Sequence, residues 1–178
     1  MNLEKIREEI SEHALEIVIH RSVLCYPSSF SFVDGLLEAN KPKKILEIGT
    51  YNCVSALVFA RYPFVERIWT LDIVQSPVIA RLRRHLDHER KITPLLVKGN
   101  VSDKSAIVGN LNCDFAFIDG DHTYEGVSVD IEVVIPKIPN VLFHDAKEAG
   151  VKKALDELEA KGTHNINRCM DFAFARKI

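Results

Sequence analysis

Two acids and a histidine follow an apolar run in the middle of the chain. The segment Asp114-Phe-Ala-Phe-Ile-Asp-Gly-Asp-His122 has the pattern of a buried strand and ends with Asp119, Asp121 and His122. Charged groups in that position lose hydration unless they are paired or liganded. A histidine close to carboxylates has the titration range of a general base, although a single loop histidine is more often an ordinary surface residue. We therefore expect the chemistry of this protein at this segment.

Another acid at the end of a later apolar run points to a metal site. Asp119 and Asp145 end different predicted strands. If these strands are neighbours in a sheet, the two carboxylates can converge on one hard divalent cation such as Mg²⁺. His144 or Asp121 could add a ligand. Asp121 precedes Thr123-Tyr124-Glu125 and also suits the N-cap of the next helix, which is the role that we expect for it.

The chain around these residues alternates between strand and helix patterns. Short apolar runs occupy residues 44–48, 67–72, 94–97, 115–119 and 141–145. Helical patterns lie near residues 53–62, 77–88, 103–110, 124–135 and 148–161. Apolar strands separated by helices are typical of a parallel sheet with both faces covered, because each crossover helix shields one face. The sequence therefore predicts an α/β three-layer sandwich.

Both ends of the chain depart from this alternation. Residues 3–20 have the spacing of an amphipathic helix, and a second short helix is expected at 30–39. Residues 162–167 have the composition of a turn region. Residues 168–176 could supply one or two antiparallel strands at an edge of the sheet.

Ligands of such sheets bind beyond the carboxyl ends of the strands. Gly49 follows the first strand, where a glycine lets the backbone approach a ligand closely. Tyr51 and Cys53 stand where the dinucleotide fingerprint has further glycines, so a tight turn explains this loop equally well. Asp72 ends the second strand, 25 residues after Glu47, where nucleotide-binding sheets place an acid for the ribose hydroxyls. We favour ligand binding for Asp72 over a helix N-cap or a rim salt bridge.

Composition excludes several classes of function. The net charge of -2 and the lack of a strongly basic segment argue against nucleic acid or an anionic membrane as the main partner. No apolar run approaches the roughly 18 residues of a membrane span, and the N-terminus lacks a signal-peptide core. The four cysteines form no Cys-x-x-Cys pair, which favours reduced thiols in a cytoplasmic protein. We expect one domain over residues 1–178, with a helical segment at 1–40 and a core at 41–178.

Four segments together resemble the class I S-adenosylmethionine-dependent methyltransferases. They are Ile45-Leu-Glu-Ile-Gly-Thr-Tyr51, Trp69-Thr-Leu-Asp72, Phe117-Ile-Asp-Gly-Asp-His-Thr-Tyr-Glu-Gly126 and Leu142-Phe-His-Asp145. The likeness is greatest to the branch with metal-dependent O-methyltransferases of macrolide-sugar and catechol type, and it covers about residues 40–160. It implies a Rossmann-like methyltransferase fold, in which a mostly parallel sheet has an antiparallel C-terminal edge.

The resemblance also implies site residues. The cofactor residues are Glu47, Gly49, Thr50 and Tyr51 for the methionine portion, Asp72 and Ile73 for the ribose, Asn100, Val101 and Ser102 for the adenine, and Asp119. In the metal-dependent members, acids matching Asp119 and Asp145 bind Mg²⁺, and a histidine matching His122 is the base. Many members have glycine in place of Cys53. They commonly add a metal ligand just before or after the last acid, where this chain has His144 and Ala146.

These features lead us to expect an S-adenosylmethionine-dependent methyltransferase that acts on a hydroxyl of a small molecule. One alternative is a cofactor-binding domain that no longer catalyses or that serves as a partner subunit. Another is an NAD-dependent Rossmann enzyme, which only Gly49 and Asp72 favour. The sequence leaves open whether the chain forms a homo-oligomer, because the leading helix can cap its own sheet or pack on a second copy.

Overall fold

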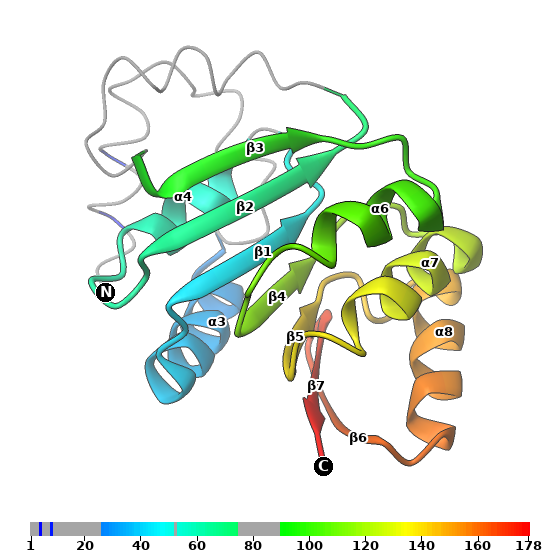
Figure 1. Cartoon of the computed structure of the whole chain (residues 1–178). Helices are drawn as coiled ribbons and strands as arrows, with labels where there is room; N and C mark the ends of the chain where they lie inside the picture. Colours follow the sequence, from blue (N-terminus) through cyan, green and yellow to red (C-terminus); the bar gives the residue numbers. More distant parts are fainter. Residues whose placement is uncertain (1–3, 5–7, 9–25, 52, 75–89) are drawn as a thin grey trace.

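The chain folds around a seven-stranded sheet that lies between two helical layers (Figure 1). The computed structural model describes residues 4, 8, 26–51, 53–74 and 90–178. The helix predicted over 77–88 lies outside the described residues, and so does the helix predicted over 3–20 except for Glu4 and Glu8. Cys25 also lies outside them. The three-layer α/β arrangement confirms the predicted fold class.

Five strands of the sheet run parallel, and two at one edge are antiparallel. The parallel strands are β1 (Lys44–Ile48), β2 (Arg67–Asp72), β3 (Ile92–Leu96), β4 (Phe115–Ile118) and β5 (Asn140–Phe143). The antiparallel strands are β6 (His164–Cys169) and β7 (Phe172–Lys177). The strand order is β3-β2-β1-β4-β5-β7-β6, so the winding direction reverses between β1 and β4. A reversal of this kind opens a crevice at the carboxyl ends of the strands.

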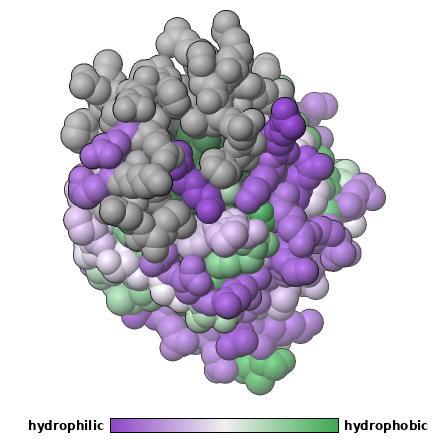
Figure 2. Space-filling view, turned by 90° about the vertical axis from the view of Figure 1, so that its left-hand side faces the viewer, coloured by the Kyte–Doolittle hydropathy of each residue, from purple (hydrophilic) through white to green (hydrophobic). Residues whose placement is uncertain are grey.

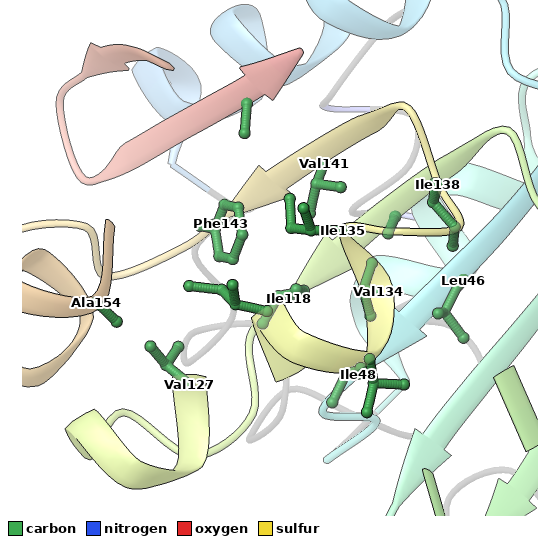
Figure 3. Close-up of a cluster of buried hydrophobic side chains, with 14 of the residues drawn as sticks. Leu46, Ile48, Ile118, Val127, Val134, Ile135, Ile138, Val141, Phe143 and Ala154 are labelled. Carbon is green, nitrogen blue, oxygen red and sulfur yellow. The ribbon is translucent and has the colours of Figure 1, made fainter. Parts of the chain in front are cut away.

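Helices cover both faces of the sheet (Figure 1). The first layer holds α3 (Pro27–Asn40) and α4 (Val54–Ala60), and the second holds α6 (Val101–Val108), α7 (Tyr124–Val134) and α8 (Ala149–Ala160). Each layer has its own hydrophobic cluster. Residues of β1 enter the two clusters in turn, because neighbouring side chains of a strand point to opposite faces. Ile45 packs in the cluster of α4, whereas Leu46 packs in the cluster of α7 that Figure 3 shows.

The predicted strand boundaries agree with the structure except near the C-terminus. β1 and β2 have the predicted limits, and β3, β4 and β5 differ by one or two residues at either end. The turn predicted over 162–167 is limited to residues 162–163, and the prediction was wrong from His164 onward, where β6 begins. His164 and Ile166 face inward, but each is followed by an exposed asparagine, Asn165 or Asn167. The sequence of this edge strand therefore lacks the continuous apolar run of the central strands.

Backbone hydrogen bonds hold the loops after the parallel strands side by side. Each bond joins the residue after one strand to the end of its neighbour: Gly49 N to Leu71 O, Asp119 N to Ile48 O, His144 N to Ile118 O and Val97 N to Asp72 O. The distances are between 2.8 and 3.0 Å. The residues that the sequence placed at strand ends consequently meet at one edge of the sheet.

Apolar residues are largely confined to the two internal clusters. The face in Figure 2 is mainly hydrophilic where the described residues form it. Within the described ranges, no helix has the length and apolar character that crossing a bilayer requires. Cys53 and Cys113 are buried and Cys169 is exposed.

Candidate active site

A cavity of about 700 Å³ opens where the loops after the parallel strands meet. Its volume is within the range of pockets that enclose a small-molecule ligand. Ten of the residues predicted from the sequence line it: Gly49, Thr50, Tyr51, Asp72, Ile73, Asp119, Asp121, His122, His144 and Asp145. The strand ends thus form one site rather than several.

The loop after β1 needs a glycine at its first position. Gly49 has φ +98°, and a side chain there would collide with the backbone oxygen of Asp119. Tyr51 and Cys53 also have positive φ, at 38° and 62°. Such values are costly for residues with a side chain, so the loop is held in a strained form. Cys53 therefore adopts a conformation that glycine would adopt more easily.

Asp72 is fixed at the rim of the cavity by two backbone amides. Its Oδ2 accepts a hydrogen bond from Tyr51 N at 2.8 Å, and its Oδ1 accepts one from Val74 N at 3.1 Å. The carboxylate joins the loop after β1 to the loop after β2. It lines the cavity and retains lone pairs that can accept protons from ligand hydroxyls.

Glu47 lies behind the loop rather than in the cavity. Its side chain is fully buried and is directed to the α4 face of the sheet, like Ile45. Thr70 donates a hydrogen bond to Glu47 Oε2, and the Thr70 hydroxyl lies 2.6 Å from that of Thr50, which does line the cavity. Burial raises the pKa of Glu47 to about 8. Among the described residues, the hydroxyl groups of Thr70 and Thr50 thus link Glu47 to the cavity.

Two acids and two histidines form a compact cluster at the other end of the cavity. His144 Nδ1 lies 2.8 Å from Asp119 Oδ1 and 3.1 Å from Asp145 Oδ2. His122 Nδ1 lies 3.1 Å from Asp145 Oδ2, and its Nε2 lies 3.6 Å from Asp119 Oδ1. Each histidine therefore faces both carboxylates. The sequence predicted that these side chains would meet, and the adjacent positions of β4 and β5 bring them together.

The pKa values in this cluster follow from burial and from the opposite charges. Hydrogen bonding to Asp119 raises the pKa of His122 above its usual value, although partial burial opposes the change. Burial lowers the pKa of His144, but the two acids outweigh it and the net change is upward. Burial acts to raise the pKa of Asp119, yet both histidines hold it below its usual value. His122 is therefore a strong proton acceptor for a histidine.

Asp121 is not the N-cap of α7, contrary to the sequence prediction. Thr123 occupies that position, and its hydroxyl accepts a hydrogen bond from Gly126 N at 3.1 Å. Asp121 instead lies two residues before the N-cap, where it accepts a hydrogen bond from Thr123 N at 2.9 Å. Both residue types suit a cap, so the sequence could not decide between them.

The comparison with protein families settles the class of the chain. A family model described as a methyltransferase domain matches residues 46–146, which is more than half of the chain. The chain belongs to this methyltransferase family. No match was found among curated proteins.

Solved structures confirm the fold of this methyltransferase. An O-methyltransferase from Bacillus cereus in complex with SAH has a TM-score of 0.73 at 16% identity, over 98% of this chain and 91% of the other. TomG from Streptomyces achromogenes, an O-methyltransferase in complex with SAM, has a TM-score of 0.67 at 17% identity, over 98% and 88%. MycE, from mycinamycin biosynthesis and in complex with Mg, SAH and mycinamycin VI, has 0.70 at 14% identity, over 97% and 54%. The fold is that of the class I S-adenosylmethionine-dependent methyltransferases.

The methyltransferase cavity has lining residues that the sequence did not indicate. Asn100, Val101 and Ser102 do not line it, because they form the start of α6, which Asn100 caps through Asp103 N. The loop after β3 contributes Val97, Lys98 and Gly99 instead. Val54, Ser55, Lys104 and Gly120 also line the cavity. Gly99, which has φ +82°, is the residue from which the sequence could have indicated this loop, because a glycine after a strand allows the backbone to approach a ligand closely.

The donor set of the methyltransferase fits a divalent cation. Asp119, His144 and Asp145 each offer one ligand atom, and these three atoms lie within 4.8 Å of one another. Two carboxylate oxygens and an imidazole nitrogen are ordinary metal ligands. Ala146, which follows Asp145, offers no side-chain ligand.

Proposed function

We propose that this methyltransferase transfers the methyl group of S-adenosylmethionine to a hydroxyl of a small molecule. The main support is the arrangement of two functional ends in one cavity. Asp72 is fixed at one rim, and His122 faces Asp119 and Asp145 at the other. A nucleoside that binds at Asp72 would direct the rest of the cofactor along the loop after β1 and toward His122.

Each part of the cofactor has residues of suitable chemistry. Asp72 can accept protons from both ribose hydroxyls. Gly49 keeps the loop after β1 close to the backbone of Asp119, which leaves Thr50 and Tyr51 beside the methionine portion. Ile73 offers an exposed apolar side chain to the adenine. When bound, S-adenosylmethionine supplies a methyl group that the sulfonium has already activated.

His122 is the candidate general base. Its side chain is 43% exposed, so an acceptor can reach it, and the two carboxylates stabilise its protonated form. A base of this kind takes the hydroxyl proton as the methyl group is transferred. Because the methyl donor is already activated, the remaining task of the protein is to orient the acceptor oxygen.

Asp119, Asp145 and His144 would hold a cation beside this base. A bound divalent cation supplies Lewis-acid chemistry that lowers the pKa of an acceptor hydroxyl. Asp145 is set for this position by its positive φ of 50°, an uncommon value for aspartate that occurs at functional sites.

Calorimetric titration with S-adenosylhomocysteine tests the cofactor assignment. We expect binding by the wild-type protein, none with NAD, and a loss of at least about tenfold in affinity for Asp72→Asn, since charge-assisted hydrogen bonds contribute about 1.5 to 3 kcal/mol. Glu66→Gln is the matched control. Glu66 lies just before the start of β2, at the end of the strand away from the cavity, and forms an exposed ion pair with Lys43. Equal affinity for Asp72→Asn and Glu66→Gln would contradict the assignment.

A cofactor-binding domain without catalysis is the second candidate. It is favoured by Ala146, which offers no ligand beside Asp145, and by Cys53 in a conformation that suits glycine. A screen of hydroxylated acceptors with radiolabelled S-adenosylmethionine separates the two candidates. Methyl transfer that is lost in His122→Ala supports the enzyme, whereas tight cofactor binding without transfer to any acceptor supports the non-catalytic domain.

A further inference from the structure

The candidate metal position has an imidazole where an all-oxygen site would have a third oxygen ligand. We infer that this position selects a transition-metal dication such as Co²⁺, Zn²⁺ or Fe²⁺ over Mg²⁺, and that His144 determines the selection. This inference rests on the proposed function, because it concerns the cation beside the candidate base.

The spacing of the three ligand atoms suits a metal with a nitrogen ligand. Adjacent ligands about 2.1 Å from a six-coordinate metal are about 3 Å apart. His144 Nδ1 lies 2.8 Å from Asp119 Oδ1 and 3.1 Å from Asp145 Oδ2. The nitrogen is thus already placed as a neighbour of both oxygens.

The protein holds the His144 ring in this place. The side chain is only 13% exposed, and its ring lies against Phe172 with the ring centres 5.2 Å apart. The backbone amide of His144 donates to Ile118 O, which continues the pairing of β5 with β4. Ligation therefore requires little movement of the ring.

Asp145 lets two consecutive side chains face the same point. Neighbouring residues of an extended strand direct their side chains to opposite faces. The positive φ of Asp145 ends the extended conformation, and ligand atoms of His144, Asp145 and Asp119 lie within 4.8 Å of one another. The strain at Asp145 thus has a specific result, which is a mixed nitrogen and oxygen donor set.

This donor set is poorly suited to Mg²⁺. Magnesium prefers oxygen ligands and keeps several waters, whereas imidazole suits Zn²⁺, Fe²⁺ and other later metals. A neutral imidazole also leaves the site with the charge of only two carboxylates. Compared with a site of three carboxylates, this site therefore attracts a hard cation such as Mg²⁺ less strongly. A softer dication gains instead from its bond to the imidazole nitrogen.

Cobalt is the probe of choice, because its visible absorption reports the coordinating atoms directly. The metal-free protein is titrated with Co²⁺, with and without S-adenosylhomocysteine, and Zn²⁺ or Mg²⁺ is then added as a competitor. We expect about one equivalent of Co²⁺ to bind, Zn²⁺ to displace it and millimolar Mg²⁺ to leave it in place. In His144→Asp we expect Co²⁺ affinity to fall at least about tenfold and Mg²⁺ to become an effective competitor.

His164→Gln is the control, since His164 lies on β6 and does not line the cavity. It should retain wild-type Co²⁺ binding, and the thermal unfolding of each variant checks that it is folded. Effective competition by Mg²⁺ in the wild-type protein would overturn the inference, as would unchanged Co²⁺ binding in His144→Asp or no metal binding at all. Calorimetry distinguishes a failure of this inference from a failure of the proposed function. If the proposed function is wrong, S-adenosylhomocysteine does not bind to the metal-free protein, whatever the metal titration shows.

Discussion

Glu47 lies in the motif that the family resemblance assigns to the cofactor, but its side chain does not line the cavity. Its carboxyl group is fully buried, and within the described residues Oε1 has no hydrogen-bond partner. The Ala56 amide, in the first turn of α4, is close enough to favour its ionised form. The Cys53 side chain makes no capping hydrogen bond to α4, and the buried carboxyl group of Glu47 can interact with the first turn of this helix through the Ala56 amide. We interpret Glu47 as an anchor for the loop after β1.

Replacement of Glu47 by glutamine should change how stability depends on pH. The folded pKa of about 8 is above the value near 4.3 in an unfolded chain, so the folded state binds the proton more tightly. This contribution is complete below the unfolded pKa and is lost as pH rises to about 8, with a slope of up to about 1.4 kcal/mol per pH unit. Glu47→Gln has no such loss. From pH 5 to 8 its free energy of unfolding should therefore rise relative to wild type by on the order of 3 kcal/mol.

Urea unfolding at several pH values measures this difference. Parallel pH profiles for the two proteins would show that Glu47 ionises normally in the folded state. Titration of Glu47→Gln with S-adenosylhomocysteine gives a second result. Binding should be retained, because the side chain does not line the cavity and glutamine can still accept a hydrogen bond from Thr70.

The sequence predicted which charged side chains meet at the cavity better than it predicted the residues that support them. Asp119, His122 and Asp145 could be identified because charged groups beside buried strands need a partner. The family resemblance placed Glu47 against the cofactor, and the strand pattern does not show whether a buried acid reaches a ligand or supports the loop beside it. The resemblance likewise placed Asn100 at the adenine, and the structure shows that its side chain caps α6 by accepting a hydrogen bond from Asp103 N.

Close packing between elements places the candidate base. Gly150, in the first turn of α8, touches the backbone of the loop before α7. A Cβ atom at this position would lie 2.5 Å from His122 O and 2.6 Å from Tyr124 N. Neither backbone atom can move without moving the base or the start of α7. The packing of α8 thus holds His122 from behind.

Gly150→Ala should therefore destabilise the protein, although alanine normally favours a helix. In an exposed helix the change from glycine to alanine stabilises by about 1 kcal/mol, but overpacking costs about 1 to 3 kcal/mol. Gly35→Ala is the matched control, because Gly35 is an exposed residue within α3 and has open space at its Cβ position. We expect thermal unfolding to show a lower midpoint for Gly150→Ala and a higher one for Gly35→Ala. A rise in both midpoints would refute the close contact.

The C-terminal hairpin shows why edge elements are harder to predict than central ones. Ile45, Leu46 and Ile48 of β1 are buried on the two faces of the sheet and give the strand its apolar pattern. β6 pairs only with β7 and buries few residues, so its polar positions resemble those of a turn. The central strands carry the site, and their apolar runs were sufficient to predict its location.

At the scale of the whole molecule, the parallel sheet gives the protein two unlike ends. All five parallel strands deliver their carboxyl ends to the cavity, whereas loops at the opposite end connect helices back to the sheet. Two of these opposite loops are the segment after α4, at 61–66, and the segment after α7, at 135–139. They do not line the cavity.

Hydrogen exchange in the presence of S-adenosylhomocysteine should reveal this polarity. Amides at 49–51, 72–74 and 119–122 should exchange more slowly with the ligand, because the ligand restricts local opening of the loops that contact it. Amides at 61–66 and 135–139 should change little, since local opening at that end leaves the cavity intact. Amides that exchange only by global unfolding, as expected in β1 and β4, should slow by the full binding free energy, about 2.7 kcal/mol at 100 times the Kd. If the ligand slowed exchange at 61–66 and 135–139 as much as at the cavity loops, the two ends of the sheet would open together. The ligand would then not act through local opening at the cavity end alone.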